Sequence, residues 1–208
     1  MQRRRLLTYA TATCTVLALT LFVGWWRVDG PGADELASKR PMPLARMEFQ
    51  MTNQDGQTVD PRTLLGSPSM VFFGFTSCPD VCPTTLADIS GWLDDLGEDA
   101  AELKVVFITI DPERDTVAAM AEYVSYFHPA IQGWGGSPDQ TKRAAEAFRA
   151  SYEKVWTNEE DYTMNHTSSV FLFSPNGRFT TTIDYHEARE FAVPKLRRAL
   201  KRRRAETS

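Results

Sequence analysis

Two short apolar runs separated by a helical pattern constrain the fold of this chain more than any other feature. The runs span residues 70–75 and 104–110. Runs of this length without polar alternation are typical of strands that are covered on both faces of a sheet. Between them, Leu86, Ile89 and Leu93 recur at spacings of three and four, which predicts a helix. Two such strands joined by a helical crossover are expected to be parallel.

Two further helices are predicted after the second apolar run. Asp115 is expected to cap a helix that places Val117, Met120 and Val124 on one face. The next helix is expected to open at the sequence Ser-Pro-Asp-Gln of residues 137–140. This sequence has a capping serine, a proline at the first helical position and a glutamine that completes a capping box.

Hairpins are predicted at both ends of the domain. Near its start, Phe49 and Met51 alternate with polar residues, and an Asp-Gly turn leads to a returning strand at Val59. Near its end, an apolar strand over 168–173 is followed by an Asn-Gly turn and a second strand over 179–183.

These elements predict an α/β fold with a mixed central sheet and an N-terminal hairpin, for which a thioredoxin-like architecture is the natural candidate. Residues 152–156 are expected to form a short strand, and residues 187–202 a last helix.

An uncharged, mostly apolar segment spans residues 6–26, directly after Arg3, Arg4 and Arg5. About 20 such residues suffice to cross a bilayer as a helix, and the arginines favour a cytoplasmic N-terminus. A cleaved signal peptide is the alternative, but its apolar region is only about 7–15 residues long. We therefore expect an uncleaved single-pass anchor in the lipid bilayer of a bacterial inner membrane, with the rest of the chain in the periplasm.

The chain is expected to have four parts. Residues 1–26 hold the basic residues and the anchor, 27–46 a tether interrupted by glycine and proline, 47–202 the folded domain, and 203–208 a basic tail. A length of 208 residues suits one domain with an appendage. The formal net charge of -4 argues against a nucleic-acid-binding protein.

Cys78 and Cys82 lie between the first buried strand and the helix that follows it. Loops at this end of α/β strands hold the functional sites of such folds, and a helix N-terminus favours the thiolate. In an oxidising compartment the pair could form a disulfide, act as a redox pair or bind metal. Three residues separate the cysteines, whereas a thioredoxin redox motif has two.

His166 is the histidine placed to complete a metal site. It lies in the segment 162–167, expected as a loop before the strand at 168–173, and in a thioredoxin-like fold that loop lies beside the cysteines. A lone histidine is more often an ordinary surface or core residue than a metal ligand. Only the presence of the cysteine pair favours the interpretation that His166 binds metal. His128 and His186 are interpreted as structural or solvent-exposed.

Three segments together resemble the Sco/SenC proteins, namely 76–83, 111–115 and 162–166. The resemblance covers about residues 47–200. It implies a thioredoxin-like copper-binding domain whose metal ligands correspond to Cys78, Cys82 and His166. It also implies a role in building the dinuclear copper centre, CuA, of cytochrome c oxidase, with the CuA-bearing subunit as partner.

One residue departs from the family pattern, because Asn165 stands where these proteins usually have an aspartate before the histidine. An amide can still form hydrogen bonds but carries no negative charge. The chemistry of the ligands supports copper independently, since soft thiolates select copper(I), zinc or iron–sulfur clusters and imidazole suits copper and zinc.

Copper delivery is therefore the leading hypothesis, with the chain as a metallochaperone and not a turnover enzyme. The alternative is a thiol–disulfide oxidoreductase in which Cys78 and Cys82 reduce the cysteines of the oxidase subunit. That reading predicts that a His166→Ala variant keeps its function. A peroxidase is a third reading, but the position of Thr76 does not give the usual spacing to Cys78.

The sequence leaves two alternative roles for each of two charged segments. Asp111, Arg114 and Asp115 follow the second buried strand, where they form either a turn with a cap and an ion pair or a docking surface for a partner. The C-terminal segment from Lys195 to Arg204 is strongly basic. It is interpreted as a solvated tail, with contact to anionic lipid as the lesser alternative.

Overall fold

The computed structural model describes residues 2–28 and 40–207, which belong to two separate compact units. The first unit, Met1–Arg40, contains the helix α1 (Gln2–Val28), and the second, Pro41–Ser208, contains the sheets and the remaining helices. Residues 29–39 of the predicted tether lie outside the described residues. The second unit includes Leu44 in the short 3-10 helix η1 (Leu44–Arg46), and this side chain is fully buried.

The helix α1 is continuous over 27 residues. Its apolar side chains between Val16 and Trp26 are exposed to between 45% and 68%. Within the described part of the chain, no helix satisfies both the length and the apolarity required of a membrane span. The anchor predicted over residues 6–26 is therefore not confirmed.

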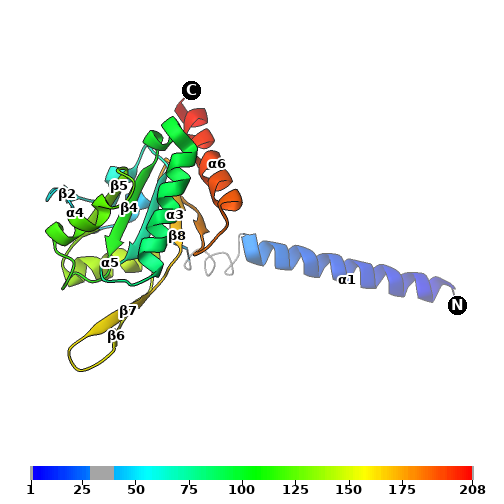
Figure 1. The fold of residues 1–208 in the computed structure, drawn as a ribbon. Coiled ribbons are helices and arrows are strands. Elements are labelled where there is room, and N and C mark those ends of the chain that lie inside the picture. Colours follow the sequence, from blue (N-terminus) through cyan, green and yellow to red (C-terminus); the bar gives the residue numbers. More distant parts are fainter. Residues whose placement is uncertain (1, 29–39, 208) are drawn as a thin grey trace. The chain divides into compact units, whose positions relative to one another are not determined.

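A seven-stranded mixed sheet forms the centre of the second unit (Figure 1). Its strand order is β2-β1-β5-β4-β3-β8-β9, in which β3, β4 and β5 are parallel and the outer pairs are antiparallel. The fold class, the N-terminal hairpin β1–β2 and the late hairpin β8–β9 are thereby confirmed. The strands are β1 (Met51–Asn53), β2 (Thr58–Val59), β3 (Ser69–Gly74), β4 (Lys104–Thr109), β5 (Ile131–Gly135), β8 (Val170–Phe173) and β9 (Phe179–Ile183).

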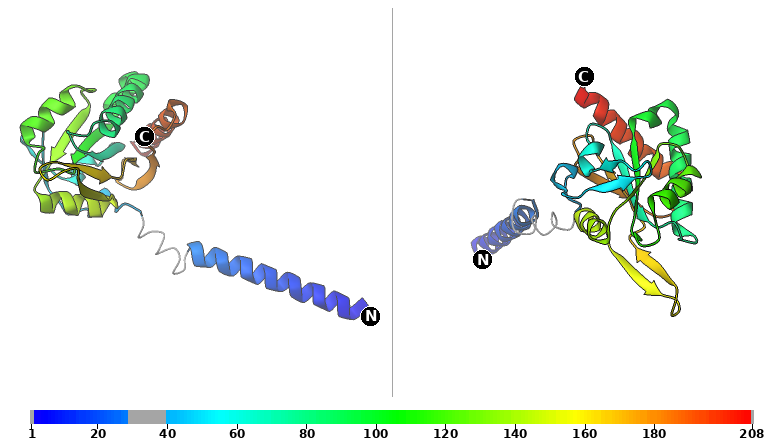
Figure 2. Two further views of the ribbon diagram at one scale, coloured as in Figure 1. Left: turned by 60° about the horizontal axis from the view of Figure 1, so that its bottom comes forward. Right: turned by 90° about the vertical axis from the view of Figure 1, so that its left-hand side faces the viewer.

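Helices cover both faces of this sheet (Figure 2). On one face Phe107 of β4 packs against Tyr123, and on the other Phe73 of β3 packs against Phe148 at a ring distance of 5.2 Å. The first face carries α3 (Val81–Leu96), α4 (Val117–Ser125) and α6 (Arg189–Thr207), and the second carries α5 (Pro138–Phe148). The short 3-10 helices η2 (Pro61–Leu64) and η3 (Gly97–Glu102) connect strands and helices.

The strand β5 is central in the sheet but was not predicted. Two of its five residues are glycines, which weaken the strand pattern in the sequence. The fold gives Gly133 a packing role, because a methyl group on it would lie 3.0 Å from carbons of both Met120 and Val124 in α4. The glycine therefore lets α4 approach the sheet, which the sequence pattern alone does not reveal.

One of the two predicted helix caps is present in the structure, and the other is formed by a different residue. The capping box between Ser137 and Gln140 is present at the start of α5. The cap of α4 is Thr116, whose hydroxyl accepts a hydrogen bond from the Ala119 amide at 3.2 Å. The prediction that Asp115 caps this helix is wrong, because its carboxylate is turned into the protein interior.

A second, two-stranded sheet extends from the body of the domain as a hairpin (Figures 1 and 2). It consists of β6 (Tyr152–Trp156) and β7 (Tyr162–His166), and its register pairs Tyr152 with His166. The strand at 152–156 is confirmed. The expectation of a loop at 162–166 is wrong, because this segment satisfies its backbone hydrogen bonds by pairing with β6.

Candidate metal centre

The two cysteines lie where β3 passes into α3. The helix begins at Val81, so Cys82 lies in its first turn and Cys78 in the preceding loop, as predicted. Cys82 is fully buried and Cys78 is partly exposed. The Cys82 amide donates a hydrogen bond to the Cys78 sulfur at 3.4 Å. The helix start therefore supplies both a thiol and an amide that stabilises a second sulfur.

A glycine in β3 makes room for the buried sulfur. A methyl group on Gly74 would lie 2.6 Å from the Cys82 Sγ and 2.7 Å from a ring carbon of Phe107. Contacts that short require one of these groups to move. The absence of a side chain at Gly74 thus determines how deeply Cys82 sits beneath the helix start.

His166 reaches the cysteines from the end of β7. Its Nε2 lies 3.5 Å from the Cys82 Sγ, and its Nδ1 lies 2.9 Å from the carbonyl oxygen of Thr167. Since a carbonyl only accepts, Nδ1 carries the proton and Nε2 presents its lone pair to the sulfurs. The rings of Phe72 and Phe75 pack against the imidazole in edge contacts at about 6 Å.

The structure brings all three predicted ligands together. One ligand atom each from Cys78, Cys82 and His166 lies within 4.8 Å of the others. Near them is an open cavity of about 290 Å³, which Met164 and Asp80 also line. The cluster is therefore accessible from solvent on the Cys78 side while Cys82 remains buried.

Asn165, the residue that departs from the family pattern, is exposed in β7 opposite Glu153. It also lines the cavity beside the cluster. The ring of His166 is oriented by the hydrogen bond that its Nδ1 donates to the backbone carbonyl of the neighbouring Thr167. The orientation of the imidazole therefore does not depend on a carboxylate at position 165.

The two thiols have pKa values shifted in opposite directions. A hydrogen bond from the Cys82 thiol is the main reason that the pKa of Cys78 falls to about 4, against the opposing effect of burial. The same hydrogen bond and burial raise the pKa of Cys82. One proton is thus held on the buried sulfur, and the partly exposed sulfur is a thiolate.

A buried carboxylate supports the loop that carries Cys78. Asp115 is 5% exposed and accepts hydrogen bonds from the amide and the hydroxyl of Thr76 at 3.1 and 2.6 Å. It accepts a third from the Thr109 hydroxyl at 2.5 Å. Burial raises the pKa of Asp115. The carboxylate therefore ties the cysteine loop to the end of β4.

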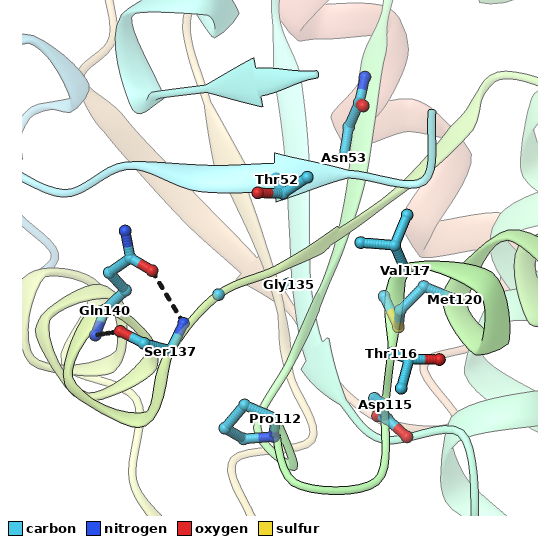
Figure 3. Close-up of a pocket in the computed structure, with 11 residues that line it drawn as sticks. Thr52, Asn53, Pro112, Asp115, Thr116, Val117, Met120, Gly135, Ser137 and Gln140 are labelled. Atoms are coloured by element: carbon cyan, nitrogen blue, oxygen red, sulfur yellow. Dashed lines mark hydrogen bonds between the residues drawn. The ribbon is translucent and has the colours of Figure 1, made fainter. Parts of the chain in front are cut away.

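Asp115 also lines a second cavity, of about 270 Å³, together with Thr52 and the helix caps Thr116 and Ser137 (Figure 3). None of the three clustered residues lines this cavity. It is therefore separate from the candidate metal centre.

A second set of contacts supports the hairpin that carries His166. The Arg114 guanidinium stacks over the Tyr162 ring at 3.9 Å and donates to the Tyr162 carbonyl at 3.0 Å. Arg114 also forms an ion pair with Asp111, and Asp111 accepts from the Tyr162 hydroxyl at 2.8 Å. Burial, followed by the Asp111 carboxylate, raises the pKa of Tyr162 to about 12.

These contacts give Asp111 and Asp115 of the segment 111–115 an internal structural role. Asp111 is 2% exposed and Asp115 is 5% exposed, so neither carboxylate is available as a docking surface. The sequence motif marked the segment, but its partners in Thr76 and Tyr162 could not be identified without the fold. His128 accepts a hydrogen bond from the Ala130 amide, a structural role, as expected.

The third histidine, His186, is exposed, also as expected. It has a left-handed backbone with a φ of 59°.

The comparison with protein families is decisive for identity. A sequence model described as SCO1/SenC matches residues 37–201. The chain belongs to the SCO1/SenC family. Among curated SCO proteins, it is 37% identical over 152 residues to "Protein SCO1 homolog 1, mitochondrial" of Arabidopsis thaliana. It is 37% identical over 134 residues to the "SCO2-like protein RC0895" of Rickettsia conorii. The matches cover 73% and 64% of this chain, but only 43% and 65% of those relatives.

Solved SCO structures share the fold. The structure of Bradyrhizobium japonicum ScoI with copper bound superposes with a TM-score of 0.69 at 41% identity, covering 73% of this chain and 96% of that chain. Yeast Sco1 with copper bound has a TM-score of 0.68 at 32% identity, with coverages of 74% and 86%. The matching part therefore makes up almost all of the ScoI chain. In this protein, residues 41–208 form a compact unit of their own.

We expect the two thiols of this SCO domain to differ sharply in reactivity. In metal-free domain at about pH 6, iodoacetamide should alkylate Cys78 at least about tenfold faster than Cys82, because only Cys78 is an accessible thiolate. Cys78 should lose reactivity only when the pH falls through its lowered pKa. Peptide mass spectrometry of timed samples measures both rates. Faster labelling of Cys82, or a Cys78 midpoint near the ordinary thiol value of about 8.5, would contradict this assignment.

Proposed function

We propose that this SCO protein binds one copper ion through Cys78, Cys82 and His166. The observation that carries the proposal is the convergence of their three ligand atoms within 4.8 Å, from a helix start and a distant hairpin. Copper-bound structures of related proteins, including Bradyrhizobium japonicum ScoI, support the choice of metal.

The chemistry of the three groups fits copper. Thiolates are soft ligands that select copper(I), and imidazole suits copper in general. Cys78 supplies its thiolate already formed, and His166 presents Nε2 because the Thr167 carbonyl holds the proton on Nδ1. Cys82 must release its proton when metal binds, so binding should release protons and weaken in acid.

The same site suits delivery of copper to an acceptor. Three protein ligands leave a coordination position open, and Cys78 lies on the solvent side of the cluster. A thiol of the acceptor can enter there and take the ion by ligand exchange, with no change in oxidation state. Another solved structure that this fold matches, at 22% identity and a TM-score of 0.60, is that of BsSco, which is described as a member of the Sco family of cytochrome c oxidase assembly proteins. We infer that the acceptor is the CuA-bearing subunit of cytochrome c oxidase.

Copper retention tests the ligand assignment. The purified domain, residues 41–208, should retain about one copper per chain after a competing chelator is added. His166→Ala should lower the apparent affinity at least about tenfold, since even loss of an outer-shell partner costs about 10–100-fold. A matched control is His186→Asn, which removes an exposed histidine and keeps a residue that tolerates a positive φ.

Metal analysis and circular dichroism of each variant give the retention and confirm folding. If the His166 and His186 variants retain copper equally, His166 is not a ligand. If the wild-type domain retains none, the copper proposal fails as a whole.

The shifted thiol pKa values favour a second candidate function, reduction of a partner disulfide. The Cys78 thiolate would attack one sulfur of that disulfide, forming a mixed disulfide and releasing the other sulfur as a thiolate. Cys82 would then lose its proton, for which His166 Nε2 at 3.5 Å is placed, and attack Cys78. The products are a reduced partner and an oxidised Cys78–Cys82 pair. A wild-type domain that retains no copper would leave this function as the better account.

We also propose that residues 6–26 anchor the protein in a bacterial inner membrane, with the SCO domain in the periplasm. The uninterrupted helix α1 and the arginines before the apolar segment support this. After an alkaline carbonate wash, the full chain should remain in the membrane pellet while residues 41–208 are released. Release of the full chain would contradict the anchor.

A further inference from the structure

The C-terminal helix α6 carries its positive charge on two different faces. On the face toward α3 and η3, Arg203 pairs with Glu102 at 3.1 Å, and Arg204 pairs with Asp99 at 2.5 Å and with Glu102 at 2.9 Å. Carboxylates thus neutralise this face. The charges there are explained by packing of α6 beside the neighbouring helices (Figure 1).

The other face, toward the edge strand β9, is not neutralised in the same way. Arg198 and Arg202 are exposed and one helical turn apart, and in the described parts of the chain no carboxylate pairs with either. Like charges at this spacing repel each other. An anion bound between them would relieve this repulsion.

A hollow between α6 and β9 could hold that anion. It has a volume of about 190 Å³ and is lined by Leu172, Thr180 and Thr181. Arg198 and Arg202 also line it, from α6. Guanidinium groups bind phosphate oxygens in a bidentate manner, and hydroxyls can donate to them as well. The lining therefore suits a phosphate group.

An exposed aromatic ring continues the same stripe of α6. Phe191 is 61% exposed, and it precedes Arg198 and Arg202 by seven and eleven residues, which places all three on one side of the helix. A soluble anion has no use for an exposed apolar ring. A lipid interface does, since interfacial helices combine aromatic residues with arginines on neighbouring positions.

We propose that this hollow binds the phosphate of an anionic phospholipid headgroup, with Arg198 and Arg202 as its ligands and Phe191 inserted beside it. The site is independent of copper and would bring the α6 edge of the domain to a membrane surface. Lys195 also lines the hollow, but its ammonium group already pairs with Glu187 at 2.7 Å and donates to the Thr182 carbonyl at 2.9 Å. The two arginines therefore supply the attraction.

Vesicle sedimentation of the domain, residues 41–208, tests this site. The domain should bind vesicles that contain about one-third phosphatidylglycerol, bind phosphatidylcholine vesicles far less, and be released by salt. Arg198→Gln/Arg202→Gln should weaken the partition at least about tenfold, since each cation near an anionic surface contributes about fivefold. Phe191→Ser should weaken it further when added to that variant.

A control variant separates position from net charge. Arg62→Gln/Arg143→Gln removes the same charge from exposed residues that do not line the hollow, and it should change the partition less than about twofold. Circular dichroism and copper retention should be unchanged in both double variants. The lipid site would be overturned if the control variant lost as much vesicle binding as the Arg198/Arg202 variant, or if the wild-type domain did not bind vesicles. It would also be overturned if the hollow bound inorganic phosphate while the domain did not bind vesicles.

Discussion

The account depends on one contact, in which His166 Nε2 lies 3.5 Å from the Cys82 sulfur. These residues are 84 positions apart, so local sequence cannot bring them together. The mixed sheet fixes the helix start that holds Cys82, and the hairpin β6–β7 carries the imidazole back to it. Everything inferred about metal chemistry follows from that convergence.

Two buried carboxylates keep the two sides of the site in place. Asp115 holds Thr76 at the base of the cysteine loop, and Asp111 with Arg114 holds Tyr162 at the start of the histidine strand. Both carboxylates come from the same turn after β4, so one short segment aligns both halves. This gives a physical reason for the two aspartates of the Asp-Pro-Glu-Arg-Asp motif, whose carboxylates are buried.

Much of the fold could be predicted from local signals in the sequence, and the site could be predicted from the expected fold and the family resemblance. The apolar runs identified β3 and β4, the capping box identified the start of α5, and the two cysteines with His166 identified the metal cluster. What could not be predicted rests on tertiary contacts. Strand β5 is obscured by glycines that make room for α4, and the contacts of Asp115 with Thr76 and of Asp111 with Tyr162 join distant parts of the chain.

The central claim is that two sulfurs and one imidazole nitrogen hold copper together. X-ray absorption at the copper edge of the loaded domain measures this coordination shell directly. The account predicts two sulfur neighbours and one imidazole nitrogen, with the nitrogen signal lost in the His166→Ala variant. A shell that contains only one sulfur, or an unchanged nitrogen signal without His166, would contradict it.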